Sequence, residues 1–301
     1  MDITKNVIVF FHIYYIDLID EYLWYLDNIK KSNYTFDLYV SICKDVSNDN
    51  VINKLIHFKS DVKITYCENQ GADVGGFFST LRNPEININL KSYNAWLFLH
   101  TKKSNHLGKE ISYYWRGQLL NDTLISPELV NTCIEKITNE NIGIVASNRC
   151  IYNIKESLIH YNSEQLMYDL LCKRFKINHV NNSNFIGGTI FWANMNILKL
   201  IIDSDIVPND FEKKFEHVGL LQHGFERMFG NLSAFLNLPI LGINLNIDNS
   251  VYHSNYKLYH FIYNNTFTFN IDKNNIILPN YDNIKYIKND KLRKKRFYSH
   301  A

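Results

Sequence analysis

Two short polar segments of the chain hold the residue types that bind a phosphate-bearing ligand. The first, ITYCENQGADVGGFF at 64–78, contains Asn69, Gly71, Asp73 and Gly75. The second, AWLFLHTKKS at 95–104, ends with His100, Thr101, Lys102, Lys103 and a serine. Each segment begins with a short apolar run, which predicts two strand ends, and we expect them to be neighbours. Because ligands of open α/β sheets bind outside the carboxyl ends of the strands, the two segments are expected to border one pocket.

The first segment predicts a turn from a strand into a helix. Gly71, Gly75 and Gly76 flank Asp73, and glycines allow a ligand to approach the backbone where a helix N-terminus offers free N–H groups. The spacing matches neither the dinucleotide fingerprint nor the P-loop. A tight turn in which Asp73 caps the helix explains the pattern equally simply, and the pattern alone favours that alternative.

The second segment places two lysines, a hydroxyl and an imidazole at the end of a strand. Such groups can hold a pyrophosphate through charge-assisted hydrogen bonds, although a solvated basic loop has the same composition. Arg116, in the following WRGQLL segment, could add a guanidinium, whose fork matches phosphate geometry. The alternative for Arg116 is a surface ion pair, with Trp115 in the core.

Two later segments could also line a pocket. NFIGGTIFWAN at 184–194 reads as one strand interrupted by Gly187 and Gly188, which indicates a bulge, a close ligand or a neighbouring backbone. In GLLQHGFERMFG at 219–230, helical spacing puts His223, Glu226 and Arg227 on one face. A histidine or carboxylate there could act as a general base, and the simpler alternative is a cluster internal to the helix.

The elements around these segments predict an α/β fold. Strands at 7–14, 36–43, 62–67 and 95–100 alternate with helices at 17–31, 51–58 and 73–82, which indicates a parallel sheet with right-handed crossovers. Further helices are expected at 112–126, 127–138, 163–175, 195–203 and 219–236, with a strand at 142–147. From about residue 240 the strand-like pieces FTFNI, NIIL and KYI lie among asparagine-rich turns.

Composition limits the class of protein. With 301 residues, 46% of them hydrophobic, the chain can build one large domain or two closely joined ones. The net charge of +2 argues against a general nucleic-acid binder. The 5 cysteines form no metal-type CxxC pair, which predicts reduced, mostly buried thiols in a cytosolic protein.

The N-terminal apolar stretch predicts a strand. It is short, contains His12 and has no small-residue cleavage site, so it differs from a signal peptide. No uncharged apolar run approaches the ~20 residues that span a bilayer. We therefore expect a protein that is soluble or attached to a membrane surface.

Taken in order, the motifs resemble those of the rhamnan synthesis protein F family of bacterial glycosyltransferases, which act in surface polysaccharide assembly. The motifs are VIVFFHIYYIDLIDEY, NQGADVGGF, LFLHTKKS, WRGQLL, FIGGTIFWAN and HGFERMFG, and they cover about residues 7 to 230. The chain departs from the family pattern at Ala72, where an arginine is expected. It also departs at Val218 and Leu220, where a more polar run is expected.

The resemblance implies a GT-A-like fold, with a Rossmann-type, mostly parallel sheet flanked by helices. This domain would span 1–240, with the donor site in about 1–120 and the acceptor side in about 120–240. Residues 241–301 would form a smaller α+β extension that ends in the basic tail LRKKRFY. The donor site would consist of Asn69, Gly71, Asp73, Gly75, His100, Thr101, Lys102, Lys103 and Arg116. The acceptor side would contain Gly187, Gly188, Trp192 and Arg227.

The resemblance also implies a reaction in which an acceptor hydroxyl attacks the anomeric carbon of a nucleotide-sugar. Glu226 is the first choice for the base, with Asp73 and His223 as rivals. Many enzymes of this fold have Asp-x-Asp where this chain has His100-Thr101-Lys102, so cations are expected to neutralise the leaving diphosphate. No metal or cofactor is therefore predicted, and a divalent metal is the alternative. Asp203-Ser204-Asp205 follows a helix, which is a poor position for a metal–nucleotide site.

The expected partners are a nucleotide-sugar donor and a glycan or lipid-linked glycan acceptor of an O-antigen, lipopolysaccharide, capsule or rhamnan type. Nucleic acid is not among them. A cytoplasmic location is expected, with a peripheral contact of the basic tail to anionic membrane as an alternative. Two other functional classes stay open: transfer of an alditol-phosphate or nucleotidyl group, and a carbohydrate- or nucleotide-binding module without catalysis.

Overall fold

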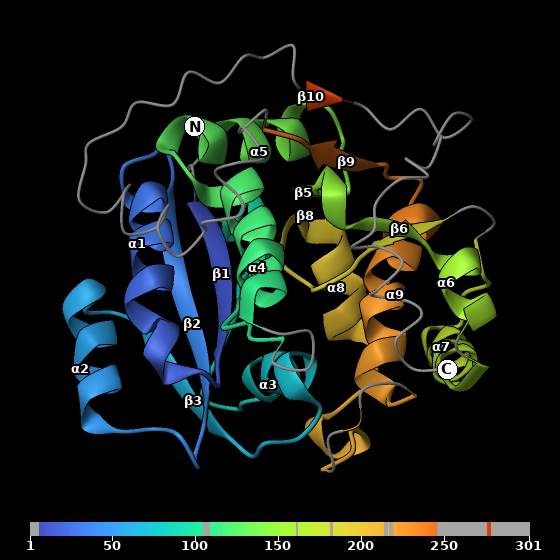
Figure 1. Cartoon of the computed structure of the whole chain (residues 1–301), viewed down its shortest axis with the longest axis horizontal. Helices are drawn as coiled ribbons and strands as arrows, with labels where there is room; N and C mark the ends of the chain where they lie inside the picture. The colour runs from blue at the N-terminus through green and yellow to red at the C-terminus, as the bar shows by residue number, and fades with distance from the viewer. Residues whose placement is uncertain are drawn as a thin grey trace.

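The computed structural model describes residues 6–104, 109–160, 162–180, 183–213, 216, 219–245 and 276–277 (Figure 1). Its first half contains β1 (Asn6–Ile13), η1 (Ile16–Leu18), α1 (Ile19–Lys30), β2 (Thr35–Cys43), α2 (Asp49–Phe58), β3 (Lys63–Cys67), α3 (Ala72–Leu81), η2 (Leu90–Ser92), β4 (Ala95–His100), α4 (Lys109–Leu124), α5 (Pro127–Asn139) and β5 (Ile144–Ser147). Its second half contains η4 (Asn148–Cys150), β6 (Ile151–Asn153), α6 (Ile154–His160), α7 (Asn162–Phe175), β7 (Asn184–Ile186), β8 (Phe191–Asn194), α8 (Met195–Asp203), η5 (Pro208–Asp210), α9 (Leu221–Phe235), β9 (Ile240–Ile243) and β10 (Ile276–Ile277).

The main sheet has eight strands in the order β10-β9-β5-β8-β4-β1-β2-β3. β1 pairs in parallel with β2 and β4, β2 with β3, and β5 with β9. β8 runs antiparallel between β4 and β5, and β10 runs antiparallel to β9. The predicted α/β class with a mostly parallel, Rossmann-like sheet is confirmed.

The strands before the two polar segments are not neighbours, so that prediction is wrong. β2 and β1 lie between β3 and β4. The chain winds in one direction from β1 to β3, and α3 then returns it across the sheet so that β4 pairs with the other side of β1. This reversal creates a topological switch point between β1 and β4. α3 thus carries Asp73 toward the end of β4 although β3 does not touch that strand.

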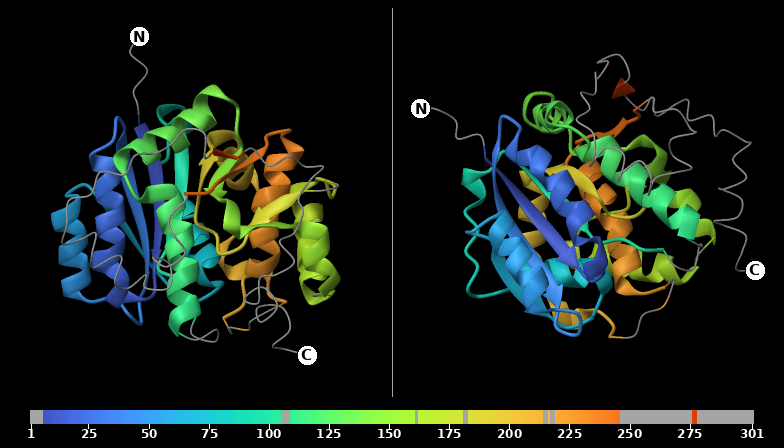
Figure 2. Two further views of the ribbon diagram at one scale, coloured as in Figure 1. Left: turned by 45° about the horizontal axis from the view of Figure 1, so that its top comes forward. Right: turned by 60° about the vertical axis from the view of Figure 1, so that its left-hand side comes forward.

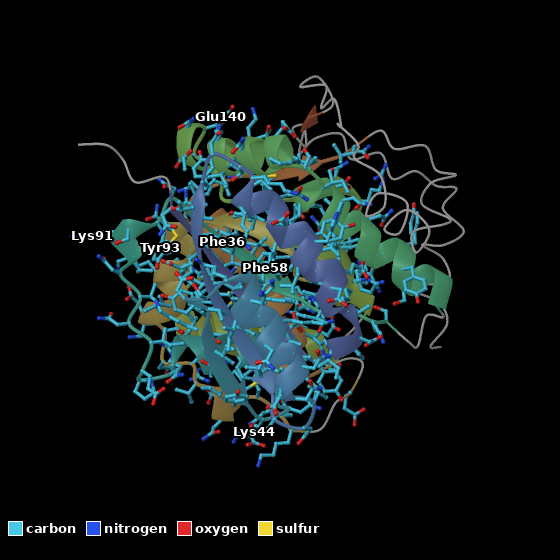
Figure 3. The ribbon with its side chains drawn as sticks, turned by 90° about the vertical axis from the view of Figure 1, so that its left-hand side faces the viewer. Phe36, Lys44, Phe58, Lys91, Tyr93 and Glu140 are labelled. Atoms are coloured by element: carbon cyan, nitrogen blue, oxygen red, sulfur yellow. The ribbon has the colours of Figure 1, made fainter. Side chains whose placement is uncertain are left out.

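Helices cover both faces of the sheet. α1, α4 and α5 pack together on one face, and α3, α8 and α9 pack together on the other (Figures 1 and 2). Lys44 directly follows β2 and Glu140 directly follows α5, and the two residues lie at opposite ends of the molecule in Figure 3. Lys44 therefore marks the end of the molecule toward which the first parallel strands run.

Local sequence explains where the helices begin. Asn48 caps α2 by accepting a hydrogen bond from Val51 N at 3.0 Å, and Ser126 caps α5 by accepting one from Leu129 N at 3.2 Å. Pro127 occupies the first turn of α5, as predicted, where its missing N–H costs nothing. These caps set the helix boundaries independently of the hydrophobic pattern.

An aromatic cluster fixes α3 and α9 against the sheet. Phe77 of α3 stacks on Trp96 of β4 with ring centroids 5.6 Å apart, and Phe229 of α9 lies 5.6 Å from Phe98. Each such side chain stabilises the fold by roughly 1.5–3 kcal/mol through burial. The polar residues on the same two helices are consequently held in fixed positions relative to the end of β4.

The segment 184–194 forms two strands in different sheets, which corrects the prediction of one strand. β7 pairs antiparallel with β6 in a two-stranded sheet, whereas β8 belongs to the main sheet. Gly188 has φ +100° and Thr189 has φ +47°, so the chain turns between them. Neither β6 nor α6 is predicted from the sequence, because elements of 3 and 7 residues show little periodicity.

The sheet also continues past residue 240, where the sequence predicts a domain boundary. β9 starts at Ile240 and pairs with β5, so it belongs to the main sheet. Within NIIL, two residues form β10, while FTFNI, KYI and LRKKRFY lie outside the described residues. Of the helices in the described part of the chain, none combines the length and the apolar character needed to cross a membrane.

Candidate active site

Two buried histidines lie side by side at the carboxyl ends of β1 and β4. His12 and His100 are register partners, at the switch point of the sheet. His12 Nδ1 lies 2.9 Å from Ser41 Oγ, and a Cβ atom at Gly76 would approach that nitrogen to 2.0 Å. α3 therefore packs directly on His12. Ligands of open α/β sheets bind at such a switch point, so the candidate site is built outward from this pair.

The turn between β7 and β8 contacts the end of β4 and two helices at once. Gly188 N–H donates to Glu226 Oε1 at 2.7 Å, and the Gly188 carbonyl accepts from His100 Nε2 at 2.8 Å. Thr189 Oγ1 donates to Asp73 Oδ2 and lies 3.3 Å from His100 Nε2. α3, β4 and α9 thus each place one polar side chain on the same two turn residues.

Only glycine fits well at the centre of this turn. At its φ of +100° an L side chain is strained. A Cβ atom at Gly188 would also lie 2.8 Å from Leu119 Cδ1 and 3.2 Å from Lys102 Cε. The absence of a side chain allows the turn to fit between α4 and the segment after β4.

Asp73 faces the site and does not cap its own helix. The N-cap of α3 is Gly71, and no side chain accepts a hydrogen bond there. Asp73 Oδ2 instead lies 3.6 Å from His100 Nε2, and the side chain keeps 17% of its surface exposed. The capping alternative is therefore wrong, and the carboxylate lies where a ligand could reach it.

Burial and neighbouring groups define the charge states of Asp73 and His100. The Gly188 carbonyl can only accept, so His100 Nε2 carries the hydrogen. Burial lowers the pKa of His100, although Asp73 opposes the shift, and the imidazole is neutral at pH 7. Burial acts to raise the pKa of Asp73, but His100, the Thr189 hydrogen bond and Lys102 together bring it below its ordinary value. The site consequently contains an aspartate carboxylate beside a neutral imidazole.

The second carboxylate, Glu226, is held at both oxygens. Oε1 accepts from Gly188 N and Oε2 accepts from Arg227 Nη1, each at 2.7 Å. The side chain remains 21% exposed. A carboxylate has about four lone-pair positions, so two remain for a substrate hydroxyl.

Arg227 lies behind Glu226 in a buried polar cluster. Its Nη2 contacts Glu164 Oε2 at 2.5 Å and donates to Ser157 Oγ at 2.9 Å, while the guanidinium lies 4.5 Å from the Phe185 ring centroid. Burial raises the pKa of Glu164 to about 7, although Arg227 opposes the shift. The structure thus gives Arg227 the role of positioning Glu226, which differs from the acceptor contact expected from the sequence.

His223 lies on the same turn of α9, as the helical spacing predicts. Its Nδ1 accepts from Leu220 N at 3.2 Å, and Arg227 Nη1 donates to the His223 carbonyl at 2.9 Å. Burial lowers the pKa of His223, with Glu226 acting in the opposite direction. His223 therefore caps α9 as a neutral imidazole.

Two departures from the family pattern lie near this helix. Leu220 is the N-cap residue of α9, and Val218 lies outside the described residues.

Of the residues after His100, Thr101 and Lys103 bond to neighbouring protein groups, whereas Lys102 faces the candidate site. Thr101 is buried, and its Oγ1 accepts from Tyr14 N and Tyr15 N at 2.9 Å each, which ties β4 to the segment after β1. The Lys103 ammonium pairs with Asp17. Lys102 Nζ lies 3.9 Å from the Trp115 ring centroid, close enough to Asp73 to lower its pKa. Lys102 is therefore the lysine of this segment that faces the site.

Arg116 forms a buried ion pair with α1. Its Nε and Nη2 donate to the Glu21 carboxylate at 3.0 and 3.1 Å, and its Nη1 donates to the Lys102 carbonyl at 3.1 Å. The guanidinium is thus occupied by protein acceptors and supports the segment that carries Lys102. A direct contact with donor phosphate, as expected from the sequence, does not fit this geometry.

The glycine turn before α3 is filled by protein atoms. A Cβ atom at Gly71 would lie 2.6 Å from Phe211 Cβ, and one at Gly75 would lie 1.8 Å from the Gln70 carbonyl oxygen. Ala72, at the position where an arginine is expected, has φ +50°. Asn69 is exposed on this turn. These glycines therefore serve close packing of the chain on itself, and not the ligand approach predicted from the sequence.

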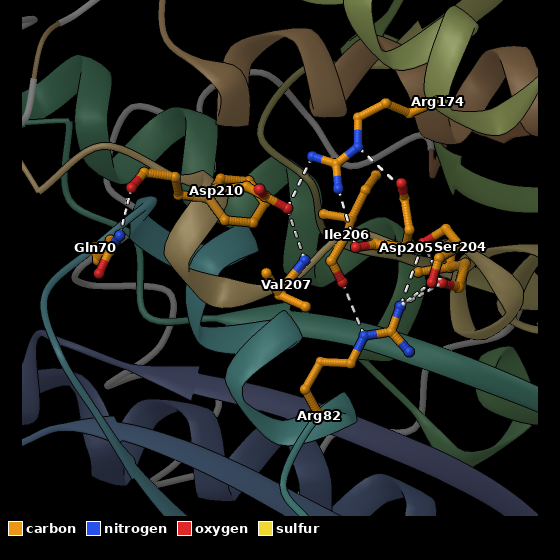
Figure 4. Close-up of polar contacts among 10 residues, drawn as sticks. Gln70, Arg82, Arg174, Ser204, Asp205, Ile206, Val207 and Asp210 are labelled. Carbon is orange, nitrogen blue, oxygen red and sulfur yellow. Dashed lines mark hydrogen bonds and ion pairs between the residues drawn. The ribbon is translucent and has the colours of Figure 1, made fainter.

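The packing partner of this turn is the segment 204–212, which side chains hold from both sides (Figure 4). Arg82 donates to the carbonyls of Ser204 and Ile206 at 2.7 and 2.8 Å, and Arg174 pairs with Asp205 and Asp210 at 3.0 and 2.8 Å. Asp203 pairs with Lys199. The Asp203-Ser204-Asp205 carboxylates are therefore used in ion pairs, away from the switch point.

Two acceptor-side expectations change in the structure. Trp192 is fully buried in β8, where its Nε1 donates to the Thr123 carbonyl at 3.1 Å, so it belongs to the core and does not line a site. Gly187 accommodates Tyr152, whose Cε2 would lie 2.6 Å from a Cβ atom there. Of Gly187, Gly188 and Trp192, it is Gly188 that contacts the candidate active-site side chains.

The cysteines agree with the prediction of reduced, buried thiols. All 5 are buried and none forms a disulfide, and Cys43 Sγ lies 4.0 Å from Cys67 Sγ. Among the described residues, no three His, Cys, Asp or Glu side chains are grouped so that they could hold a metal ion.

Four residues of this cluster, His12, Thr189, Glu21 and Glu164, are not among the site residues predicted from the sequence. Thr189 directly follows the two glycines, so the motif itself was a signal for it. Glu21 and Glu164 lie far along the chain from Arg116 and Arg227, and no local pattern links them. Their roles depend on which helices pack together.

The fold and this cluster define a Rossmann-like α/β protein with two partly exposed carboxylates, a neutral histidine and a lysine near its switch point. The family model for rhamnan synthesis protein F matches residues 1–235, so the chain belongs to that family. Membership connects the chain to polysaccharide synthesis.

The chain is also similar to two curated proteins. Both are named uncharacterized protein WxcX, from strains B100 and ATCC 33913 of Xanthomonas campestris pv. campestris, and each is 27% identical over 233 residues. The match covers 75% of this chain but 31% of each relative. The chain therefore spans about a third of the length of the curated relatives it matches.

Proposed function

We propose that this chain is a glycosyltransferase domain that moves a sugar from a nucleotide-sugar to a growing surface polysaccharide. The observation that carries the proposal is the meeting of Asp73, His100 and Glu226 around the Gly188–Thr189 turn, next to the β1/β4 switch point. Support also comes from the sheet order β3-β2-β1-β4-β8-β5-β9, in which β8 alone is antiparallel, as expected of a GT-A-like domain.

In the proposed reaction, Glu226 acts as the general base. The acceptor hydroxyl oxygen bonds to the anomeric carbon of the donor, its proton passes to a Glu226 oxygen, and the bond from the anomeric carbon to the diphosphate oxygen breaks. Hydrogen bonds from Gly188 and Arg227 fix the carboxylate before the reaction. General bases positioned in this way contribute typically 10²–10⁴-fold, as an order of magnitude.

Asp73 and Lys102 are assigned to the donor side. Thr189 and His100 cover one side of the Asp73 carboxylate. Its exposed part can accept hydrogen bonds from hydroxyls of the donor sugar or ribose. Lys102 is assigned to the leaving diphosphate because it packs against the Gly188 turn and lowers the pKa of Asp73. Arg116 is bound to Glu21 and Lys103 to Asp17. A charged group that stabilises developing negative charge in the transition state lowers the barrier without a metal.

The acceptor is proposed to be a glycan or a lipid-linked glycan. The expected contact of LRKKRFY with anionic membrane lies outside the described residues and stays a prediction. Flotation with liposomes that contain anionic lipid, using chains with and without residues 291–301, tests it. Equal flotation of the two chains would exclude a role for the tail.

The proposed function is tested by a transfer assay with a panel of nucleotide-sugars and glycan acceptors. We expect release of a nucleoside diphosphate together with a lengthened glycan. With a nucleotide-alditol as donor, release of a nucleoside monophosphate with a phosphorylated product would indicate alditol-phosphate transfer. Release of a sugar 1-phosphate from a nucleotide-sugar, with a nucleotidylated product, would indicate nucleotidyl transfer. Donor binding without turnover of any acceptor would indicate a binding module. Each of these three outcomes would overturn the proposal.

A further inference from the structure

A hollow lies at the far end of α3 from the candidate active site. Its volume is about 480 Å³, and its lining includes Thr65, Tyr66, Arg82, Asn83, Glu85 and Asn209. Arg82 follows Asp73 by nine residues, which corresponds to about 13 Å along a helix. The hollow is therefore separate from the Asp73–His100–Glu226 cluster, yet built on the same helix.

One wall of the hollow is rigid because its polar groups are already bonded within the protein. The three guanidinium nitrogens of Arg82 donate to backbone carbonyls, among them Ile206 and Ser204 (Figure 4). Asn83 Nδ2 donates to Thr65 Oγ1 at 3.0 Å, and Asn83 Oδ1 accepts from Glu85 N at 3.0 Å. This wall joins β3, α3 and the segment 204–212, so its shape is preformed.

In contrast to this wall, three side chains at the rim of the hollow are exposed to solvent. Tyr66 is 51% exposed, and Glu85 and Asn209 are exposed as well. Within the described part of the chain, the Tyr66 hydroxyl, the Glu85 carboxylate and the Asn209 amide have no hydrogen-bond partner. An aromatic ring, an anionic acceptor and an amide are thus presented together to a ligand.

We infer that this hollow is a glycan-binding subsite, which engages a stretch of polysaccharide away from the reacting end. Ligand sites combine aromatic surface with a few placed polar groups, and sugar hydroxyls both donate and accept, so they match a carboxylate, an amide and a phenol. A phosphate or nucleotide does not match, because Arg82 is the cation of this lining and its nitrogens point at carbonyls. The assignment of polysaccharide as the glycan rests on the proposed function.

The subsite and the candidate active site are mechanically connected. The segment 204–212 contributes Asn209 to the hollow, and its end contacts the turn before α3, where Gly71 N donates to the Glu212 carbonyl at 3.2 Å. Glu212 Oε2 in turn accepts from Leu221 N at the start of α9. A chain bound in the hollow would therefore lie on the elements that position both Asp73 and Glu226.

Binding of neutral tetrasaccharides of rhamnose, mannose and glucose to the full chain, without donor, tests the subsite by saturation-transfer NMR and titration. We expect at least one tetrasaccharide to bind. Tyr66→Ala should weaken its binding by about three- to tenfold, as for loss of an aromatic contact, while Tyr66→Phe keeps most of it. The matched control is Phe235→Ala, which removes another exposed ring that does not line the hollow and should leave binding unchanged.

The subsite is disproved if no tetrasaccharide binds at millimolar concentration, or if Tyr66→Ala binds as tightly as the wild-type chain. Binding that is lost in Asp73→Asn but retained in Tyr66→Ala would also disprove it, because the glycan would then occupy the active site alone. Since no donor is present, these results are independent of turnover. A failed transfer assay combined with Tyr66-dependent binding would overturn the proposed function and leave the subsite standing.

Discussion

Gly188 N–H donates to Glu226 Oε1 at 2.7 Å, so the turn after β7 and the first turns of α9 are directly joined. The carbonyl of the same glycine accepts from His100 at the end of β4. A single residue without a side chain therefore sets the distance between the proposed base and the switch point of the sheet. The geometry of the site depends on this turn as much as on the side chains it contacts.

Glu226→Gln is expected to lower kcat of sugar transfer by about 100- to 10,000-fold, because glutamine cannot accept the acceptor proton. Its amide oxygen can still accept from Gly188 N, so the thermal unfolding midpoint should hardly change. Glu128→Gln, at an exposed position in the first turn of α5, is the matched control. If Glu226→Gln keeps full activity while Asp73→Asn loses it, the base is Asp73.

Lys102→Ala is expected to lower kcat/KM for the donor by about 10- to 100-fold, since hydrogen bonds to charged groups are worth roughly 1.5–3 kcal/mol. Lys103→Ala serves as the comparison, because its ammonium pairs with Asp17 at the surface and such pairs contribute little. Steady-state kinetics with donor varied would measure both. An equal loss in the two variants would contradict the separate roles given to them.

Arg116→Ala is expected to destabilise the fold by about 3–5 kcal/mol, because it leaves the Glu21 carboxylate, whose side chain is 14% exposed, without its partner. Denaturant unfolding measures this change. Arg116→Met combined with Glu21→Leu should recover much of the stability. A stable but inactive Arg116→Ala chain would instead favour the donor contact expected from the sequence.

Glu164 is expected to make stability depend on pH. Burial raises its pKa from 4.5 to about 7, so the folded state holds this proton more tightly than the unfolded state. Its contribution is therefore complete below pH 4.5 and is lost as pH rises through 7. Relative to Glu164→Gln, the free energy of unfolding of the wild-type chain should fall by about 2–3 kcal/mol over this range. A pH-independent difference would show that Glu164 keeps its ordinary pKa.

Long apolar runs made the sheet predictable. VIVFFHI and AWLFLH are buried almost throughout, and runs of that kind are typical of parallel strands covered on both faces. The order of the strands was not predictable from the runs alone. The reversal of winding after β3 depends on which face α3 covers, so β3 and β4 were wrongly expected to be neighbours.

The candidate site was predictable only where a strand ends in polar residues. His100 ends such a run and Lys102 follows it, and the structure places His100 beside Asp73 and Lys102 against the Gly188 turn. Thr101 and Arg116 have the same residue types as a phosphate site, yet their partners are backbone groups and Glu21, which are distant in the sequence. Residue type therefore indicated the region, while long-range packing decided which side chains face a ligand.

A crystal structure of the chain with a bound nucleoside diphosphate would test the site directly. We expect the diphosphate outside the ends of β1 and β4, within hydrogen-bonding distance of Lys102 Nζ and adjacent to Asp73 and the Gly188–Thr189 turn. A diphosphate held elsewhere, with Lys102 and this turn untouched, would contradict the central claim that the switch-point cluster is the active site.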